Sequence, residues 1–440
     1  MKYISLSIGL LMALVNFSCK TVKTPTVSPK PIWETEVEKL AVFAQNHTGF
    51  ALYDATAQQM MVSYQADRYF VPASNTKLFS FYAGLSCLGD SIPALKYTIR
   101  GDSLLFWGTG DPSLLHPDLH NTKVFDFLRS RSEKLFYSTS NDQVNPYGAG
   151  WQWDDYNDYY QPEVTGLPMY GNIIRFKARF TDRLEVNPPY FWQFLQPDTA
   201  RKATQRVVRD FYENRFVYQP FTAKVNYEQD VPFRTSAALT TALLSDTLHR
   251  QVTLVNLSPQ PNWQVQTLYS LRADTLYKRM LQVSDNMLAE QLMILCASAS
   301  NKPLSSENGI GHVMRTYLSD LPDKPTWVDG SGLSRYNVFT PRTMVALLQK
   351  IQAKVPQERL FELLAIGGKT GTLRNQFKEA EPFVFAKTGS VSNVYNLSGY
   401  LKTKSGKLLI FSMMNNNFVR PTSEIRKEVE RILRLVYEGY

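Results

Sequence analysis

Histidines, cysteines and long apolar runs are all scarce in this chain. Its 440 residues include five histidines, and none of them falls in H-E-x-x-H or a comparable metal-binding spacing. The sequence therefore predicts no metal ion and no cofactor. Basic residues give a net charge of +9 but are scattered, whereas nucleic-acid-binding proteins cluster them and interleave them with aromatics. We therefore expect no nucleic-acid partner.

The one long apolar run lies at the N-terminus, between Ile4 and Val15. It is shorter than the about 20 apolar residues that a membrane-spanning helix needs, and a lysine precedes it, which is typical of a secretory signal. Residues 1–19 are predicted to be a signal peptide, and the polar, proline-punctuated residues 20–31 a linker. Cys19 resembles a lipoprotein processing site whose preceding residues depart from the usual pattern, so lipid anchoring and plain cleavage both stay open. Either outcome predicts the cell envelope or periplasm.

The rest of the chain has the composition of a folded protein with more than one domain. It contains 44% hydrophobic and 20% charged residues, and its length exceeds what a single core holds. Two cysteines, Cys87 and Cys296, lie in apolar helical patterns. We interpret them as buried free thiols, with a disulfide between them as the alternative.

Strand and helix patterns place similar elements at the two ends of the chain. Apolar alternation predicts strands over residues 48–54 and 60–64, followed by a buried helix that begins near Ser74. Short strands, turns and dense aromatics indicate an inserted module after this helix. Later patterns predict a helix over 275–297, strands between 383 and 414, and a last helix over 422–437. We expect one sheet built from both ends of the chain.

Ser74-Asn-Thr-Lys77 pairs a hydroxyl with an amine on one face of the predicted helix. A serine hydroxyl becomes a good nucleophile when a neighbouring base removes its proton, and a lysine whose pKa is lowered can be that base. Alone the pattern is weak, because chance supplies about one such match in a chain of this length. The alternative is a helix N-cap at Ser74 beside a solvated lysine.

A polar triplet, Ser284-Asp-Asn286, interrupts the apolar pattern of the helix predicted over 275–297. In a nucleophilic mechanism Ser284 relays a proton to the leaving amine, and Asn286 hydrogen-bonds the substrate amide. The alternative is a solvent-facing patch. A second S-x-N, Ser306-Glu-Asn308, is expected in a polar loop and is discounted.

The tripeptide K-T-G occurs twice, and the flanking residues separate the two copies. Lys387-Thr388-Gly389 follows a compact apolar run and precedes a turn and a return strand, so we expect it on a strand with free backbone beside it. Lys369 instead follows two glycines in a loop. A cationic lysine and a threonine hydroxyl at a strand edge form a carboxylate receptor, which a peptidase acting beside a free C-terminus requires.

The order S-x-x-K, S-D-N, K-T-G is the signature of penicillin-binding proteins and class A β-lactamases. Beyond it, the chain resembles the D-alanyl-D-alanine carboxypeptidase/endopeptidases, the class C low-molecular-mass penicillin-binding proteins, over nearly the whole mature sequence. The similar blocks are Gly108-Thr-Gly-Asp-Pro-Ser-Leu114, Gly150-Trp-Gln-Trp-Asp-Asp155, Ser284-Asp-Asn-Met-Leu-Ala-Glu290, Asp329-Gly-Ser-Gly-Leu-Ser-Arg335, Gly371-Thr-Leu-Arg374 and Ala386-Lys-Thr-Gly-Ser390 through Ser398-Gly-Tyr400.

The resemblance implies a multi-domain α+β fold, with a penicillin-binding/serine β-lactamase-like sheet and flanking helices. The short strands, turns and aromatics of residues 93–235 predict a β-rich inserted module, so the catalytic domain is expected to be discontinuous, over residues 32–92 and 236–440. The resemblance also implies the substrate class: D-Ala-D-Ala ends of peptidoglycan stem peptides, D-Ala-diaminopimelate cross-links, or both. β-Lactam antibiotics would then be covalent ligands.

By the same resemblance, Ser74 attacks the substrate carbonyl and Lys77 is the general base. The backbone N–H groups of Ser74 and Ser390 form the oxyanion hole. Thr388 and Gly389 bind substrate beside Lys387.

Three further residues are candidates for substrate contact. Asp155 and Arg335 carry an acid and a guanidinium that suit the two charged ends of a diaminopimelate-like side chain, and a structural hydrogen-bonding role is the alternative for each. Ser392 is close to Lys387 in sequence and is expected to line the same cleft.

Two other functions compete with the peptidase. A serine β-lactamase needs a second base for rapid deacylation, and no carboxylate is identified for it. The separation of Ser74 from Ser284 is also too long for a compact β-lactamase. A non-catalytic wall-binding or sensor protein is disfavoured because the set of reactive residues is complete.

Overall fold

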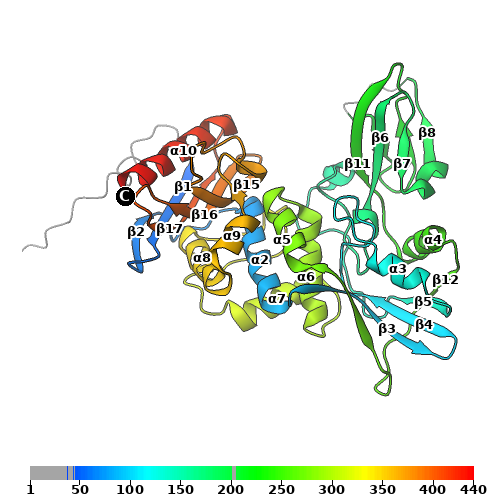
Figure 1. The fold of residues 1–440 in the computed structure, drawn as a ribbon. Coiled ribbons are helices and arrows are strands. Elements are labelled where there is room, and N and C mark those ends of the chain that lie inside the picture. Colours follow the sequence, from blue (N-terminus) through cyan, green and yellow to red (C-terminus); the bar gives the residue numbers. More distant parts are fainter. Residues whose placement is uncertain (1–36, 38–42, 44, 201–204) are drawn as a thin grey trace, which may run out of the picture.

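The computed structural model describes residues 37, 43, 45–200 and 205–440. The predicted signal peptide, the predicted linker and Cys19 lie outside the described residues. Figure 1 shows two lobes side by side. The main lobe, residues 45–90 and 273–440, combines the first and last parts of the chain, and the inserted lobe is residues 91–272. Within the described ranges, no helix is long and apolar enough to span a membrane.

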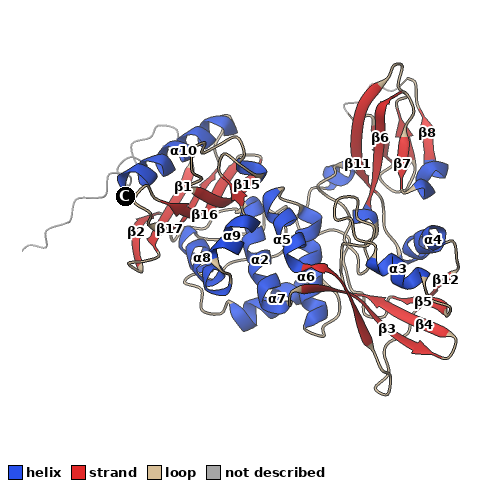
Figure 2. Cartoon of the chain, viewed as in Figure 1, coloured by secondary structure: helices blue, strands red, loops and turns tan. Residues whose placement is uncertain are grey.

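A six-stranded antiparallel sheet forms one side of the main lobe, in the order β14-β15-β16-β17-β1-β2. The strand from the beginning of the chain pairs with the last one, as the sequence predicted. Almost every residue of β16 and β17 is buried, because helices cover both faces of the sheet (Figure 2). The strands are β1 (His47–Asp54), β2 (Gln59–Tyr64), β14 (Ala365–Ile366), β15 (Val384–Val391), β16 (Val394–Lys402) and β17 (Leu408–Asn416).

Helix α10 covers one face of this sheet and the remaining main-lobe helices lie on the other. Helix α6 is the most buried of them, because its apolar residues continue around the whole helix rather than along one stripe. It packs between α2 and α7. The helices are α2 (Thr76–Cys87), α5 (Ala273–Gln282), α6 (Asn286–Ala299), α7 (Ser306–Tyr317), α8 (Pro341–Lys354), α9 (Gln357–Leu363) and α10 (Thr422–Gly439).

The single helix predicted over 275–297 is wrong, because the structure divides it into α5 and α6. Ser284 has a φ of 65°, which an α-helix cannot contain. The Asp285 side chain then starts α6 by accepting a hydrogen bond from the Leu288 N–H at 3.1 Å. The S-D-N triplet is therefore a turn between two helices. The discounted Ser306-Glu-Asn308 was also misplaced, since it forms the first turn of α7 and is not in a loop.

The inserted lobe contains a five-stranded sheet, two three-stranded sheets and a separate apolar core. The predicted module boundary at residue 235 falls inside this lobe, because two strands beyond it pair with earlier ones: β12 with β5 and β13 with β3. The elements are β3 (Ser91–Arg100), β4 (Ser103–Gly108), α3 (Lys123–Arg129), β5 (Lys134–Ser138), β6 (Ile173–Thr181), β7 (Glu185–Asn187), β8 (Leu195–Pro197), β9 (Val207–Arg209), β10 (Phe216–Tyr218), β11 (Val225–Pro232), α4 (Ala237–Leu248), β12 (Val252–Val255) and β13 (Gln266–Arg272).

The two cysteines of the predicted helical patterns lie at the α2–α6 packing. Both are free thiols, and Cys296 is buried, but Cys87 is only partly buried. The interpretation of two fully buried thiols is therefore corrected for Cys87, which stands at the C-terminal end of α2 where the helix reaches the surface.

The contact between α6 and α7 makes a prediction about stability. A methyl group added at Gly309 would lie 2.0 Å from the carbonyl oxygen of Met293, so Gly309→Ala should lower the free energy of unfolding by about 1–3 kcal/mol or more. Gly311, in the same helix, would meet only the flexible end of Arg315. Gly311→Ala should instead raise stability by about 0.5–1 kcal/mol. Urea unfolding of both variants checks this, and equal midpoints would refute the packing argument.

Candidate active site

Ser74 lies in a short 3-10 turn, η1 (Ala73–Asn75), that leads into α2. Ala73 has a φ of 47°, a strained conformation for a residue with a side chain. The Asn75 side chain ties this turn to the sheet, because its Nδ2 donates to the Lys387 carbonyl at 2.9 Å and its Oδ1 accepts from Ser398 Oγ at 2.6 Å. The strained turn is thus held against β15.

Gly389 of the K-T-G sequence is what lets β15 approach so closely. A methyl group there would lie 2.4 Å from the Pro72 carbonyl oxygen and 3.0 Å from the Asn75 nitrogen. The glycine therefore serves the contact between the strand and the nucleophile turn, a role that any side chain would block.

Lys77 follows Ser74 by one helical turn and is fully buried. Its Nζ donates to Ser74 Oγ at 2.9 Å, to Asn286 Oδ1 at 2.6 Å and to the Ser331 carbonyl at 2.7 Å, so all three ammonium hydrogens have acceptors. Burial lowers the pKa of Lys77 to about 8, against the opposing effect of nearby carboxylates. A lysine with a lowered pKa loses one of these hydrogens readily, and the neutral amine can then take up a proton from the serine hydroxyl beside it.

The S-D-N and K-T-G sequences meet at a second buried lysine. Lys387 Nζ donates to Ser284 Oγ at 2.9 Å and to the Thr388 carbonyl at 2.7 Å. Burial, together with the charge of Lys77, holds the pKa of Lys387 well below its usual range. Asn286 connects these residues to the inserted lobe, because its Nδ2 donates to the Tyr160 carbonyl at 2.9 Å. The structure therefore brings together all five residues predicted to be catalytic.

A cleft of about 580 Å³ opens in front of these groups and is lined by both lobes. Lys77, Lys387 and Gly389 lie behind its wall and are buried. Thr388 is half-buried and donates to Thr372 Oγ1 at 2.8 Å, so the Gly371-Thr-Leu-Arg374 block contacts the K-T-G strand. The predicted residues that line the cleft are Ser74, Asp155, Ser284, Asn286, Arg335, Ser390 and Ser392.

The outer edge of β15 is open along this cleft. Strand β14 pairs only with Phe385 and Ala386, and within the described residues no other strand covers β15 beyond them. Ser390 is exposed there. An extended peptide can add to such an edge through main-chain hydrogen bonds.

Asp155 and Arg335 approach the cleft from different lobes. Asp155 lies in η2 (Trp153–Asn157) of the inserted lobe, and partial burial raises its pKa. Arg335 Nη2 donates to the Ser392 carbonyl at 2.8 Å. The structure therefore places Arg335 and Ser392 in contact and Asp155 in the same cleft.

Two buried acids behind Lys77 were not assigned a function from the sequence. The Glu290 carboxylate accepts from the Gly330 N–H at 3.0 Å and from the Ser331 N–H at 2.7 Å, which aims the Ser331 carbonyl at Lys77. Burial and the neighbouring Asp329 raise the pKa of Glu290 to about 7. The sequence did contain a signal for Glu290, because it is an acidic residue within the otherwise apolar run of α6. In the part of the chain that the structure describes, no cluster of His, Cys, Asp and Glu is arranged to hold a metal ion.

A serine turn, a buried lysine and an open strand edge around one cleft define a serine-type peptidase of the penicillin-binding class. The family model for D-Ala-D-Ala carboxypeptidase 3 (S13) matches residues 35–435, so the chain belongs to that family. This confirms the predicted family, the enzyme class and the fold class.

One curated relative matches nearly the whole chain, another matches about a third of it, and a solved structure shares the fold. The D-alanyl-D-alanine carboxypeptidase DacB of Haemophilus influenzae is 24% identical over 99% of this chain and 97% of its own. Carboxypeptidase DacB of Mycolicibacterium smegmatis is 33% identical over 32% of this chain and 33% of its own. The crystal structure of penicillin binding protein 4 (dacB) from H. influenzae superposes with a TM-score of 0.71 at 22% identity, covering 92% of this chain and 98% of that one.

Close packing behind the nucleophile turn gives a second prediction. Gly332 has a φ of 82°, and a methyl group there would lie 1.9 Å from the Ala73 carbonyl oxygen. Gly332→Ala should displace the turn and lower turnover of a D-Ala-D-Ala peptide on the order of 100-fold. Gly406 has a φ of 91° but nothing within 4 Å, so Gly406→Ala isolates the conformational cost of about 1–2 kcal/mol. Equal activity of the two variants would contradict the steric argument.

Proposed function

We propose that this protein is a serine DD-peptidase that hydrolyses the D-Ala-D-Ala ends of peptidoglycan stem peptides through an acyl-enzyme on Ser74. The observation that carries the proposal is the 2.9 Å hydrogen bond between Lys77 Nζ and Ser74 Oγ, made by a fully buried lysine. Burial keeps part of the lysine neutral near physiological pH, and only the neutral amine can accept the serine proton.

Acylation proceeds by transfer of the Ser74 proton to neutral Lys77 while Oγ attacks the carbonyl carbon of the penultimate D-Ala. The backbone N–H groups of Ser74 and Ser390 hold the developing oxyanion. Ser284 relays a proton from Lys77 to the nitrogen of the terminal D-Ala as the peptide bond breaks, which leaves Lys77 neutral again and Ser284 as a hydroxyl. Water then loses a proton to Lys77 as it attacks the acyl carbonyl, and Lys77 returns that proton to Ser74 Oγ when the shortened peptide leaves.

Lys387 and Thr388 receive the terminal carboxylate. Burial lowers the pKa of Lys387 most, and the charge of Lys77 lowers it further. A neutral Lys77 removes the second effect, and an incoming carboxylate opposes the first, because it favours the charged form of Lys387. The two buried lysines thus have different roles. Lys77 is neutral and acts as the base, whereas Lys387 is charged and binds the substrate carboxylate. Asn286 hydrogen-bonds the substrate amide, and Gly389 acts indirectly, by letting β15 pack against the turn that carries Ser74.

Asp155, Arg335 and Ser392 contact the stem peptide further along the cleft. An acid and a guanidinium complement the amino and carboxylate ends of a diaminopimelate-like side chain. The same acyl transfer cleaves D-Ala-diaminopimelate cross-links when the leaving amine belongs to such a side chain. Their position along one cleft with Ser74 supports this assignment.

Export to the cell envelope follows from the substrate, because peptidoglycan lies outside the cytoplasmic membrane. The apolar N-terminal run supports a signal peptide. Lipid anchoring through Cys19 would keep the enzyme at the membrane surface, within reach of the wall.

Penicillin should acylate Ser74, because its strained amide and carboxylate mimic the dipeptide end. A crystal structure of the H. influenzae penicillin binding protein 4 in complex with a β-lactam has a TM-score of 0.68 to this chain at 20% identity.

We expect labelled penicillin to leave a long-lived adduct on the peptide containing Ser74, mapped by mass spectrometry on the chain without residues 1–31. Ser74→Ala should lose the adduct, and Ser86→Ala, in the helix α2 that follows the Ser74 turn, should keep it. Rapid loss of the adduct would instead indicate a β-lactamase, and no adduct a non-catalytic binding protein.

The rate of acylation should rise with pH. Below the Lys77 pKa of about 8, the neutral fraction of a base grows about tenfold per pH unit, and the rate grows with it until it reaches a plateau. Glu290→Gln removes a carboxylate that raises the pKa of Lys77, so its rise should occur at lower pH. Stopped-flow acylation from pH 6 to 10 checks both. A rate that is flat or falling over this interval would exclude Lys77 as the base.

A further inference from the structure

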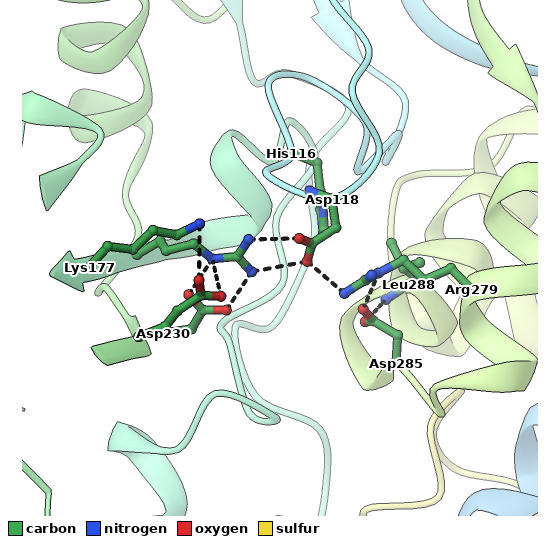
Figure 3. Close-up of polar contacts among 9 residues, drawn as sticks. His116, Asp118, Lys177, Asp230, Arg279, Asp285 and Leu288 are labelled. Atoms are coloured by element: carbon green, nitrogen blue, oxygen red, sulfur yellow. Dashed lines mark hydrogen bonds and ion pairs between the residues drawn. The ribbon is translucent and has the colours of Figure 1, made fainter. Parts of the chain in front are cut away.

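A chain of ion pairs connects the inserted lobe to the S-D-N turn of the main lobe (Figure 3). Arg175 of β6 pairs with Asp230 of β11 and with Asp118, each at 2.7 Å. Asp118 in turn pairs with Arg279 of α5 at 2.7 Å, and Arg279 pairs with Asp285 at 3.1 Å. Three carboxylates and two guanidinium groups therefore alternate from one lobe to the other.

Asp118 is the carboxylate at which the two lobes meet. Its Oδ1 accepts from Arg175 of the inserted lobe, and its Oδ2 accepts from Arg279 of the main lobe. Although partial burial acts the other way, hydrogen bonding from Arg175 and the charge of Arg279 lower the pKa of Asp118 to about 2. The carboxylate is thus ionised throughout the physiological range and keeps both partners.

The loop that carries Asp118 is fixed within the inserted lobe. The backbone N–H of Asp118 donates to His116 Nδ1 at 3.1 Å. The buried His116 ring packs against Gly171, because a methyl group at Gly171 would come within 3.0 Å of the ring. Asp118 therefore presents its carboxylate to the main lobe from a rigid support.

On the other side, Arg279 and Asp285 bracket the turn that contains Ser284. Arg279 lies near the C-terminal end of α5, and Asp285 caps α6 by accepting from Leu288 at 3.1 Å. Ser284 between them has a φ of 65°, a conformation that persists only where the surroundings impose it. This conformation places Ser284 Oγ at 2.9 Å from Lys387 Nζ, so a change in the turn would break that hydrogen bond.

We propose that Asp118 is a positioning residue, through which the inserted lobe holds Arg279 and thereby keeps the Ser284 turn in its strained conformation. Asp118 and Arg279 both line the cleft. Within the described residues, however, the Asp118 carboxylate accepts hydrogen bonds from Arg175 and Arg279, and its effect on the five groups proposed to react passes through Arg279. The kinetic part of this inference rests on the proposed function, because it uses acylation of Ser74 as its measure. The structural part does not.

Asp118→Asn tests the proposal, and its control is a matched ion pair of α5, the helix that carries Arg279. Asp274 of α5 pairs with Arg359 at 2.7 Å, and its side chain is 26% exposed, as is that of Asp118. We expect Asp118→Asn to slow acylation by penicillin about 10- to 100-fold, since small displacements at a reacting centre carry such costs, with the concentration dependence little changed. Asp274→Asn should stay within about twofold of the unmodified enzyme. A normal rate in Asp118→Asn would overturn the proposal.

A second background shows whether Arg279 carries the effect. In Arg279→Gln the connection is already broken, so adding Asp118→Asn should slow acylation no further. An equal loss in both backgrounds would show that Asp118 acts by another route and would overturn the proposal. If Asp118→Asn does not fold, Arg279→Lys keeps the charge but loses the fork that reaches both carboxylates, and a normal acylation rate in that variant would refute the proposal as well.

Hydrogen exchange separates this inference from the proposed function. Backbone amides over residues 283–288 should exchange several-fold faster in Asp118→Asn than in Asp274→Asn, whether or not the protein reacts with penicillin. Unchanged exchange there would overturn the positioning role. Faster exchange, with an unmodified enzyme that fails to acylate, would uphold it and reject the peptidase mechanism alone.

Discussion

The structure depends on one costly arrangement, a lysine amine buried completely beside a serine hydroxyl. An unpaired ammonium ion in a protein interior costs several kcal/mol, and in practice its pKa falls until it can lose the proton. Here three acceptors meet the amine, and two buried acids, Glu290 and Asp329, lie close enough to raise its pKa. The result is a compromise, with a pKa of about 8, in which the lysine is stable in the core and can still act as a base.

Close approach of distant segments is the second constraint, and it explains the glycines and the strained residues. The nucleophile turn has Gly389 of β15 on one side and Gly332 on the other, and neither position leaves room for a methyl group. Ala73 and Ser284 both adopt positive φ values next to or within the reactive set. Such strain is tolerated because the surrounding sheet and helices fix these turns from several directions.

The sequence predicted the sheet and the three motifs well, because local alternation and residue order carry that information. It failed where a tertiary contact decides. The apolar pattern resumes beyond the polar triplet Ser284-Asp-Asn286, so the triplet alone does not distinguish a break between α5 and α6 from a polar patch on one continuous helix. Strands β12 and β13 are assigned to the inserted lobe only by pairing with β5 and β3, which lie more than a hundred positions earlier. For the same reason the partnership of Asp118 with Arg279 is invisible without the fold.

The route of the chain connects the inserted lobe directly to the S-D-N turn of the candidate site. The chain enters this lobe at β3, after the nucleophile helix, and leaves it at β13, which runs directly into α5. Helix α5 ends at the Ser284 turn, so the lobe is joined to that turn by one short helix and, a second time, by the ion pairs through Asp118. Tyr160 of the same lobe also holds Asn286 by its carbonyl. The position of the inserted lobe is therefore coupled to the S-D-N turn by the chain itself, by the ion pairs through Asp118 and by the Tyr160 carbonyl.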